Sequence, residues 1–349
     1  MKRLNVILLL ALFALLFLTR LQTQSITDKS IVHAAGIDKS GSELSVTLQV
    51  FKPEAAGADT PIDISKANFK TIKASGSTTR ECLSKLSAQA GSELFFGHLQ
   101  LIVIGRDVMY SSPDDIFSPF LTDLSIYPGT YLACADSAEK TVSLPIKENA
   151  VTAENYKKII EVSSSKGICI KASLDDIPTT FEETGTLAMP YITIKGENED
   201  KHLDISGSGV MNAHSFDKSL IPKDECKYLS LVTCGSDSDG SPLELDVNGN
   251  FFGLKNISRS YSADHRQDGF HISIKISADT DLPKDKVKET ESALSEKLES
   301  AISSTLSDGI DAAALYKQLR LQCPWAYAES ESTMMTVSAD ITLYSKGKI

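Results

Sequence analysis

An uncharged apolar run close to the N-terminus places the strongest constraint on what this chain can fold into. Lys2 and Arg3 come just before it, and it extends from Val6 to Leu18 without a charged residue. A basic start followed by an unbroken aliphatic and aromatic run is typical of a bacterial export signal, because such a run has no polar face to turn toward water. We therefore expect residues 1–21 to form a signal or membrane-anchor segment.

The same segment leaves two alternatives for its fate after export. As a helix the run spans roughly 20 Å, less than the roughly 30 Å of a bilayer core, although Leu4 and Leu21 lengthen it. Residues 16–21 contain no alanine, glycine or serine, so the usual small-x-small cleavage site is absent. We expect the segment to stay attached as an anchor, and the alternative is a cleaved signal with an unusual site.

Composition indicates globular domains with an acidic surface. The 349 residues include 46 Asp and Glu against 35 Lys and Arg, which gives a formal charge of −11, and 42% of them are hydrophobic. This length suffices for two domains, or three small ones, each with its own core. Because an acidic surface repels phosphate and no basic stripe offsets it, we expect no nucleic-acid partner.

Cysteines and histidines do not follow a metal-binding pattern. No Cys-x-x-Cys, His-x-x-x-His or His-Glu-x-x-His sequence is present, and neither is a glycine-rich nucleotide loop. We therefore expect no metal and no cofactor. Free thiols are expected, and a disulfide between Cys226 and Cys234 is the alternative. Residues 237–240 resemble part of a calcium loop but lack its third early ligand, so we interpret them as an acidic turn.

Two Ser-x-x-Lys sequences, at 163–166 and 215–218, come closest to a catalytic motif. They match the serine and lysine of penicillin-recognising enzymes. Those enzymes also need a later Lys-Thr-Gly-type strand, whereas the comparable tripeptide here, at 39–41, precedes both sequences. We interpret both as solvated loops, expect no catalytic residue, and predict that the chain is not an enzyme.

Hydrophobic periodicity predicts interleaved strands and helices. Residues 31–37 and 44–50 form strands of a hairpin with its turn at 38–41, and a capping box at 78–81 opens a helix that ends at Gly91. Residues 94–105 read as one largely buried strand. The other predicted elements are helices from 112–113, over 153–162 and over 283–306, and strands over 191–195, 203–211, 270–276 and 335–343.

The mixture of tight turns and longer crossovers predicts an α+β fold with mixed and antiparallel sheets flanked by helices. A charged loop at 196–201 marks the predicted domain boundary, with one α+β region over 22–198 and another over 199–349, the second as one unit or two small subdomains. His98 interrupts the predicted strand 94–105. We expect it to be a hydrogen-bonded structural histidine, and the alternative is a titrating or contact residue.

Several segments together resemble the Ger(x)C family, the C subunits of bacterial spore germinant receptors. Residues 94–105 are similar to the family's aromatic-Gly-His-Leu strand that ends in Val-Ile-Gly, and residues 31–38 to its Ile-Val-x-Ala-x-Gly-Ile-Asp block. Residues 205–211 and the closing strand with Gly347 match more weakly. The residues that carry the resemblance, and for which we expect structural or interaction roles, are Gly36, Asp38, Phe96, Gly97, His98, Gly105 and Gly207.

The resemblance implies a non-enzymatic, membrane-associated subunit outside the cytoplasm, on the outer face of the spore inner membrane. It implies assembly with an A subunit and a transporter-like B subunit into a receptor triggered by nutrients, and a fold of three small α+β domains. The family is typically lipidated on a cysteine of a Gly-Cys pair, where this chain has residues 19–21 without cysteine. The alternative function is an extracytoplasmic solute-binding protein, and the third is a secreted hydrolase.

Overall fold

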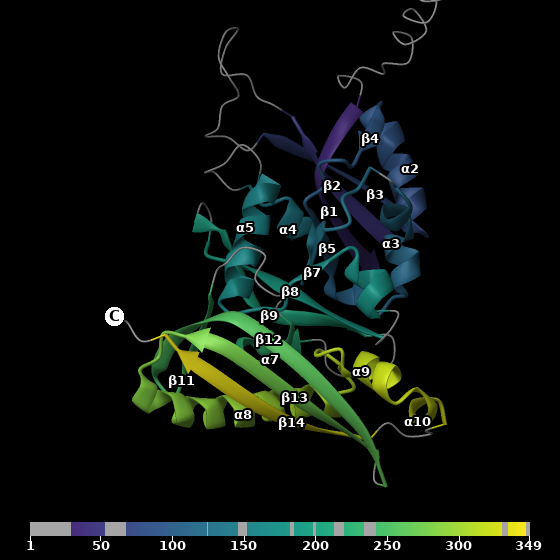
Figure 1. Ribbon diagram of the computed structural model, residues 1–349. Coiled ribbons are helices and arrows are strands. Elements are labelled where there is room, and N and C mark those ends of the chain that lie inside the picture. The colour runs from purple at the N-terminus through teal and green to yellow at the C-terminus, as the bar shows by residue number, and fades with distance from the viewer. Residues whose placement is uncertain are drawn as a thin grey trace, which may run out of the picture.

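The computed structural model contains two sheets connected by helices (Figure 1). The predicted anchor at 1–21, the second Ser-x-x-Lys sequence, the acidic turn, Cys234 and Gly347 lie outside the described residues. The described residues are 29–52, 68–123, 125–145, 152–181, 185–197, 200–212, 220–233, 242–267, 269–329 and 334–346.

The larger sheet has parallel strands at its centre and antiparallel strands at its edges. The central strands, which pair in the order given, are β1 (Lys29–Ser40), β5 (Leu101–Gly105), β6 (Tyr131–Ala135) and β8 (Thr186–Lys195). The antiparallel additions are β2 (Glu43–Phe51) and β3 (Phe69–Gly76) beside β1, and β9 (His202–Asn212) and β10 (Leu220–Ile221) beside β8. Two short strands, β4 (Glu93–Phe95) and β7 (Ala172–Ser173), pair with β1 and β6.

Helices cover both faces of this sheet, which explains why its central strands are apolar on both sides. Alternate residues of β5 point to opposite cores: Ile102 and Ile104 belong to one cluster, Leu101 and Val103 to the other. The first cluster includes side chains of α2 (Thr79–Ala90) and α3 (Pro113–Thr122), and the second those of α4 (Ala138–Val142) and α5 (Thr152–Ser165). Figure 1 shows the two pairs of helices on opposite sides of the sheet.

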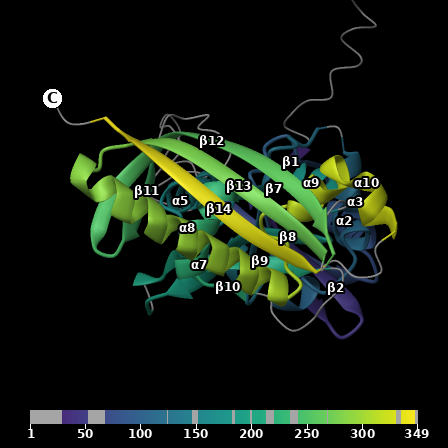
Figure 2. The same ribbon diagram turned by 60° about the horizontal axis from the view of Figure 1, so that its bottom comes forward.

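The smaller sheet packs against a long helix and against the edge of the larger sheet. Its strands, in order, are β11 (Leu243–Val247), β12 (Asn250–Arg266), β13 (Gly269–Thr280) and β14 (Met335–Ser345). Its helices are α7 (Lys223–Thr233), α8 (Lys284–Ser307), α9 (Leu315–Gln322) and α10 (Pro324–Glu329). Figure 2 shows α8 running alongside β14. Val210 and Ile221 of the larger sheet join the same core, so this cluster connects the two sheets.

The α+β class with mixed sheets is confirmed, and so are the four predicted helices, as α2, α3, α5 and α8. At the start of α2, the Thr78 side chain accepts a hydrogen bond from the Glu81 N–H at 3.1 Å, as the capping box predicts. The Glu81 carboxylate reaches one residue further back, to the Ser77 N–H at 2.9 Å. Gly91 ends the helix in the left-handed conformation, with φ of 66°.

The prediction of one continuous strand over 94–105 is wrong. β4 ends at Phe95, a turn follows at Gly97 and His98, and β5 begins only at Leu101. The Leu99 N–H bonds to the Phe96 carbonyl at 2.9 Å, which closes the turn. The apolar composition of the segment is explained by two short parallel strands beside β1 rather than one long strand.

Two shorter predictions are also corrected. The first hairpin turns at residues 41–42, so Asp38 belongs to β1 and not to the turn. Residues 163–165 form the last turn of α5 rather than a solvated loop, and Ser163 and Ser164 are buried there. The periodicity of the helix therefore continues three residues beyond its predicted end.

The predicted boundary between residues 198 and 199 falls within a hairpin of the larger sheet, because β8 and β9 pair antiparallel across it. The division into 22–198 and 199–349 stays a prediction. No helix in the described part of the chain is both long and apolar enough to cross a bilayer.

Candidate functional site

Asp38 ties the first strand of the larger sheet to a helix 100 residues further along the chain. Its carboxylate accepts hydrogen bonds from the N–H groups of Ala138, at 2.8 Å, and Glu139, at 2.7 Å. These are the first two residues of α4, whose N–H groups have no partner within the helix. A carboxylate is also favoured there by the partial positive charge of a helix N-terminus. Asp38 therefore caps α4 from a neighbouring strand.

Gly36 and Gly105 leave the room that this contact requires. A Cβ at Gly105 would lie 2.3 Å from Asp38 Oδ1, and a Cβ at Gly36 would lie 3.0 Å from the backbone of Ala138. Either side chain would push the carboxylate or the helix out of position. The structure thus brings together three of the predicted residues: Gly36 and Asp38 come from the block at 31–38, and Gly105 comes from the separate block at 94–105.

A polar cluster that the sequence reasoning missed lies next to Gly105. Arg106 Nη2 is 2.7 Å from the Tyr191 hydroxyl and 2.8 Å from Asp136 Oδ1, and the Tyr191 hydroxyl donates to the same Asp136 oxygen at 2.6 Å. Burial and the bond to Asp136 raise the pKa of Tyr191, so its phenol stays protonated at neutral pH. Arg106 and Asp136 each directly follow a buried parallel strand, and this position is the signal that could have indicated the cluster.

His98 lies at the opposite end of β1, and it is exposed rather than part of a buried strand. Its ring contacts the rings of Phe95 and His33, at centroid distances of 6.1 and 6.3 Å. His33 also packs against Phe51 at 5.4 Å. Burial, and secondarily the proximity of His98, lower the pKa of His33 to about 4. His33 is therefore neutral at neutral pH, in a cluster of aromatic rings.

Three further predicted residues have places that their environment explains. Phe96 is buried, and its ring meets that of Phe120 edge-on at 5.9 Å. A Cβ at Gly97 would lie 2.5 Å from the Phe95 ring. Gly207 lies apart, in β9, with φ of 115° and its backbone against the Ile221 carbonyl, where a Cβ would come within 2.3 Å. The seven residues thus lie in three separate places.

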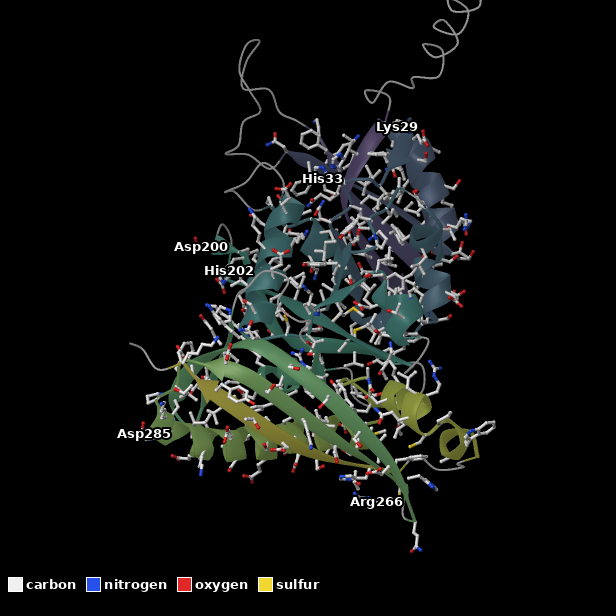
Figure 3. All side chains as sticks on the ribbon, in the orientation of Figure 1. Lys29, His33, Asp200, His202, Arg266 and Asp285 are labelled. Atoms are coloured by element: carbon white, nitrogen blue, oxygen red, sulfur yellow. The ribbon has the colours of Figure 1, made fainter. Side chains whose placement is uncertain are left out.

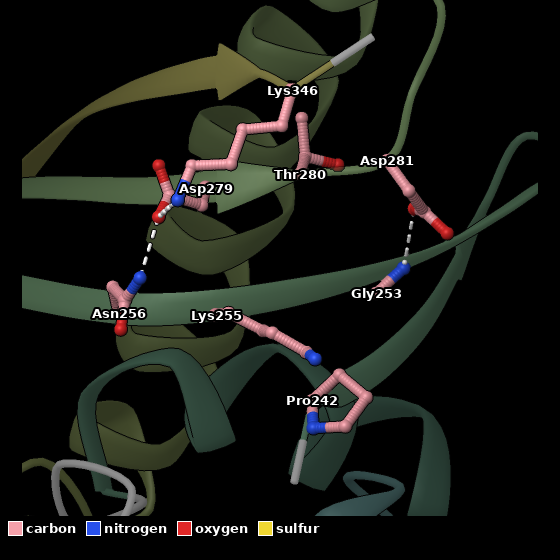
Figure 4. Close-up of a pocket in the computed structure, with 8 residues that line it drawn as sticks. All are labelled: Pro242, Gly253, Lys255, Asn256, Asp279, Thr280, Asp281 and Lys346. Carbon is pink, nitrogen blue, oxygen red and sulfur yellow. Dashed lines mark hydrogen bonds and ion pairs between the residues drawn. The ribbon is translucent and has the colours of Figure 1, made fainter. Parts of the chain in front are cut away.

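A pocket of about 330 Å³ opens on the smaller sheet, beside β12 and β13 (Figure 4). Within it, Asp279 accepts hydrogen bonds from Lys346 Nζ and Asn256 Nδ2, both at 2.5 Å, and these contacts lower the pKa of Asp279. Asp281 accepts from the Gly253 N–H at 2.9 Å. The pocket is lined by Pro242, Gly253, Lys255, Asn256, Asp279, Thr280, Asp281 and Lys346.

Two features of the described residues bear on chemistry: the side chains that could bind a metal ion, and the first Ser-x-x-Lys sequence. No group of three or more His, Cys, Asp or Glu side chains among them could hold a metal ion. Lys166 is 3.9 Å from Glu244 Oε2, while Ser163 is buried in α5. Burial also raises the pKa of the Cys226 thiol to about 11, so that this sulfur is protonated and unreactive at neutral pH.

Three comparisons with known proteins bear on the chain. Residues 22–194 match a family model described as the spore germination protein N-terminal domain. No curated protein matches the sequence. A solved structure titled "Crystal Structure of the GerBC protein" is similar with a TM-score of 0.49 and 16% identity, covering 88% of this chain and 96% of that chain. Every predicted motif residue except Gly207 lies inside the segment that the family model matches.

Proposed function

Because the chain belongs to the Ger(x)C family of spore germination proteins, we propose that it is the C subunit of a nutrient germinant receptor. The observation that carries this proposal is the match to the spore germination protein N-terminal domain over residues 22–194. In the proposal the chain does not catalyse a reaction. It works by binding to an A subunit and a B subunit of the same receptor, and nutrients trigger the assembled complex.

We place the chain on the outer face of the spore inner membrane, held there by residues 1–21. Only seven residues, 22–28, separate that segment from Lys29, and an extended connector of this length reaches at most about 25 Å. The end of the larger sheet that carries Lys29 would therefore face the bilayer. Figure 3 shows Arg266, at the far end of the smaller sheet, on the opposite side of the molecule.

The predicted motif residues divide between two roles in this proposal. Gly36, Asp38 and Gly105 have a structural role, because they hold α4 against the sheet. His98 is the candidate for an interaction role, because its exposed ring lies at the end of the larger sheet that carries Lys29. In the proposal this end faces the membrane and the A and B subunits. An attached anchor would raise the local concentration of this surface beside its partners without any further contact.

Membrane fractionation and co-purification from spores test the proposal. A tagged chain should sediment with the inner membrane and purify together with the A and B subunits. Removing residues 1–21 should release it from the membrane and weaken the response of spores to nutrients, whereas an unrelated single-span anchor in their place should restore both. Recovery of the chain from the cytosol of growing cells, together with an unchanged nutrient response after deletion of its gene, would contradict the proposal.

A further inference from the structure

The pocket beside β12 and β13 contains four charged side chains, of which two neutralise each other. Lys346 and Asp279 form an ion pair at 2.5 Å. Lys255 lies directly opposite Asp279 in the strand register, yet Asp279 binds Lys346 and Asn256 instead. Among the described residues, neither Lys255 nor Asp281 has an oppositely charged partner. One positive and one negative charge are thus left open in the same pocket.

The backbone of β12 is distorted at this place. The pairing with β13 shifts register between Lys255 and Ser258, and Asn256 has φ of 51° in the left-handed region. Asparagine is among the few non-glycine residues that adopt this conformation readily. At the distortion, the Asn256 side chain donates a hydrogen bond to Asp279. Bulges of this kind re-aim side chains and are common beside binding sites.

The geometry points to a small zwitterion, a molecule with a carboxylate and an ammonium group, as the ligand of this pocket. Its carboxylate would bind the Lys255 ammonium and its ammonium group the Asp281 carboxylate. The volume of about 330 Å³ lies within the range of small-molecule sites. In Figure 4 the Lys255 side chain ends near Pro242, while Asp281 lies beyond Gly253. A ligand with a single charge would satisfy only one of the two.

The inference concerns the smaller sheet alone and does not rest on the proposed receptor function. Isothermal titration of the full chain in detergent micelles tests it with glycine, β-alanine and 4-aminobutyrate, which differ in the separation of their charges. Propionate and ethylammonium are the probes with one charge. At least one zwitterion should bind saturably, and both single-charge probes should bind about tenfold more weakly or worse.

Two substitutions locate the site. Lys255→Met removes the positive charge and Asp281→Asn the negative one, and each should weaken zwitterion binding by about tenfold or more. Lys275→Met, at an exposed lysine elsewhere on β13, is the matched control and should leave affinity unchanged. All three positions are exposed, so circular dichroism should show unchanged folding. The inference is overturned if none of the three zwitterions binds, if propionate or ethylammonium binds equally well, or if neither pocket substitution affects binding.

Discussion

Replacing Gly105 with alanine tests the structural role assigned to the motif residues. The backbone of Gly105 has φ of −69° and ψ of 156°, which alanine adopts without strain. If only the backbone mattered, Gly105→Ala should stabilise the protein by about 0.4–1 kcal/mol, because alanine lowers the conformational entropy of the unfolded chain. The structure predicts the opposite sign, because the new methyl group would lie 2.3 Å from Asp38 Oδ1.

The size of the effect follows from the contacts that would be lost. A carbon and an oxygen that are not bonded approach to about 3.3 Å, so the carboxylate must retreat by about 1 Å. That movement breaks or lengthens its bonds of 2.8 and 2.7 Å to the N–H groups of Ala138 and Glu139. Loss of a helix cap costs about 0.5–2 kcal/mol, and hydrogen bonds to a charged group contribute about 1.5–3 kcal/mol each. We expect a net loss of about 2 kcal/mol in the free energy of unfolding.

Urea unfolding of the full chain in detergent, followed by circular dichroism, measures this change as a shift of the midpoint. The decisive comparison is a double-mutant cycle with Asp38→Ala, which removes the group that the methyl would strike. In that background Gly105→Ala should be neutral or slightly stabilising, so the coupling between the two positions should be about 1–3 kcal/mol. Asp107→Asn, an exposed neighbour, serves as the control. Equal effects of Gly105→Ala in both backgrounds would refute the reasoning.

Three further predictions concern single residues. The pKa of His33 falls from 6.5 to about 4 on folding, so the folded state disfavours protonation of this ring. As the pH falls from 6.5 to 4, the protein should lose about 2–3 kcal/mol of stability relative to the variant His33→Gln. Urea midpoints that change in parallel with pH for both proteins would argue against this prediction. Trp325, the single tryptophan, is 82% exposed. Iodide should therefore quench its fluorescence almost as strongly as that of a free tryptophan analogue. Weak quenching in the isolated chain would be inconsistent with the exposed position of Trp325 in α10. Iodoacetamide at mildly alkaline pH should modify the half-buried Cys323 well before the buried Cys226, whose thiol has a pKa of about 11. Peptide mapping by mass spectrometry measures the order of modification, and the reverse order would contradict the described burial.

The sequence predicted the class of fold and four of the helices, α2, α3, α5 and α8, because the signals for these features are local. Thr78 and Gly91 mark the ends of α2 through caps that involve only neighbouring residues. The apolar stripe of α8 repeats with helical period over 24 residues, which leaves few alternatives. The same reasoning failed for the segment 94–105, because two short strands joined by a turn can be as apolar overall as one long buried strand, and periodicity does not separate the two cases.

The sequence by itself therefore determined three things: the segments at 31–38 and 94–105 that resemble the family, the class of fold, and the apolar N-terminal run. The signal for each of them lies in residues that are neighbours in the chain. Only the tertiary structure decided what Asp38 does, because its partners are N–H groups 100 residues away, and only it placed Gly36 and Gly105 beside that contact. The open charge of Lys255 likewise depends on Lys346, which directly follows β14, pairing with Asp279. Hydrogen bonds and ion pairs act over a few ångströms of space, and folding, not chain order, determines which groups come that close.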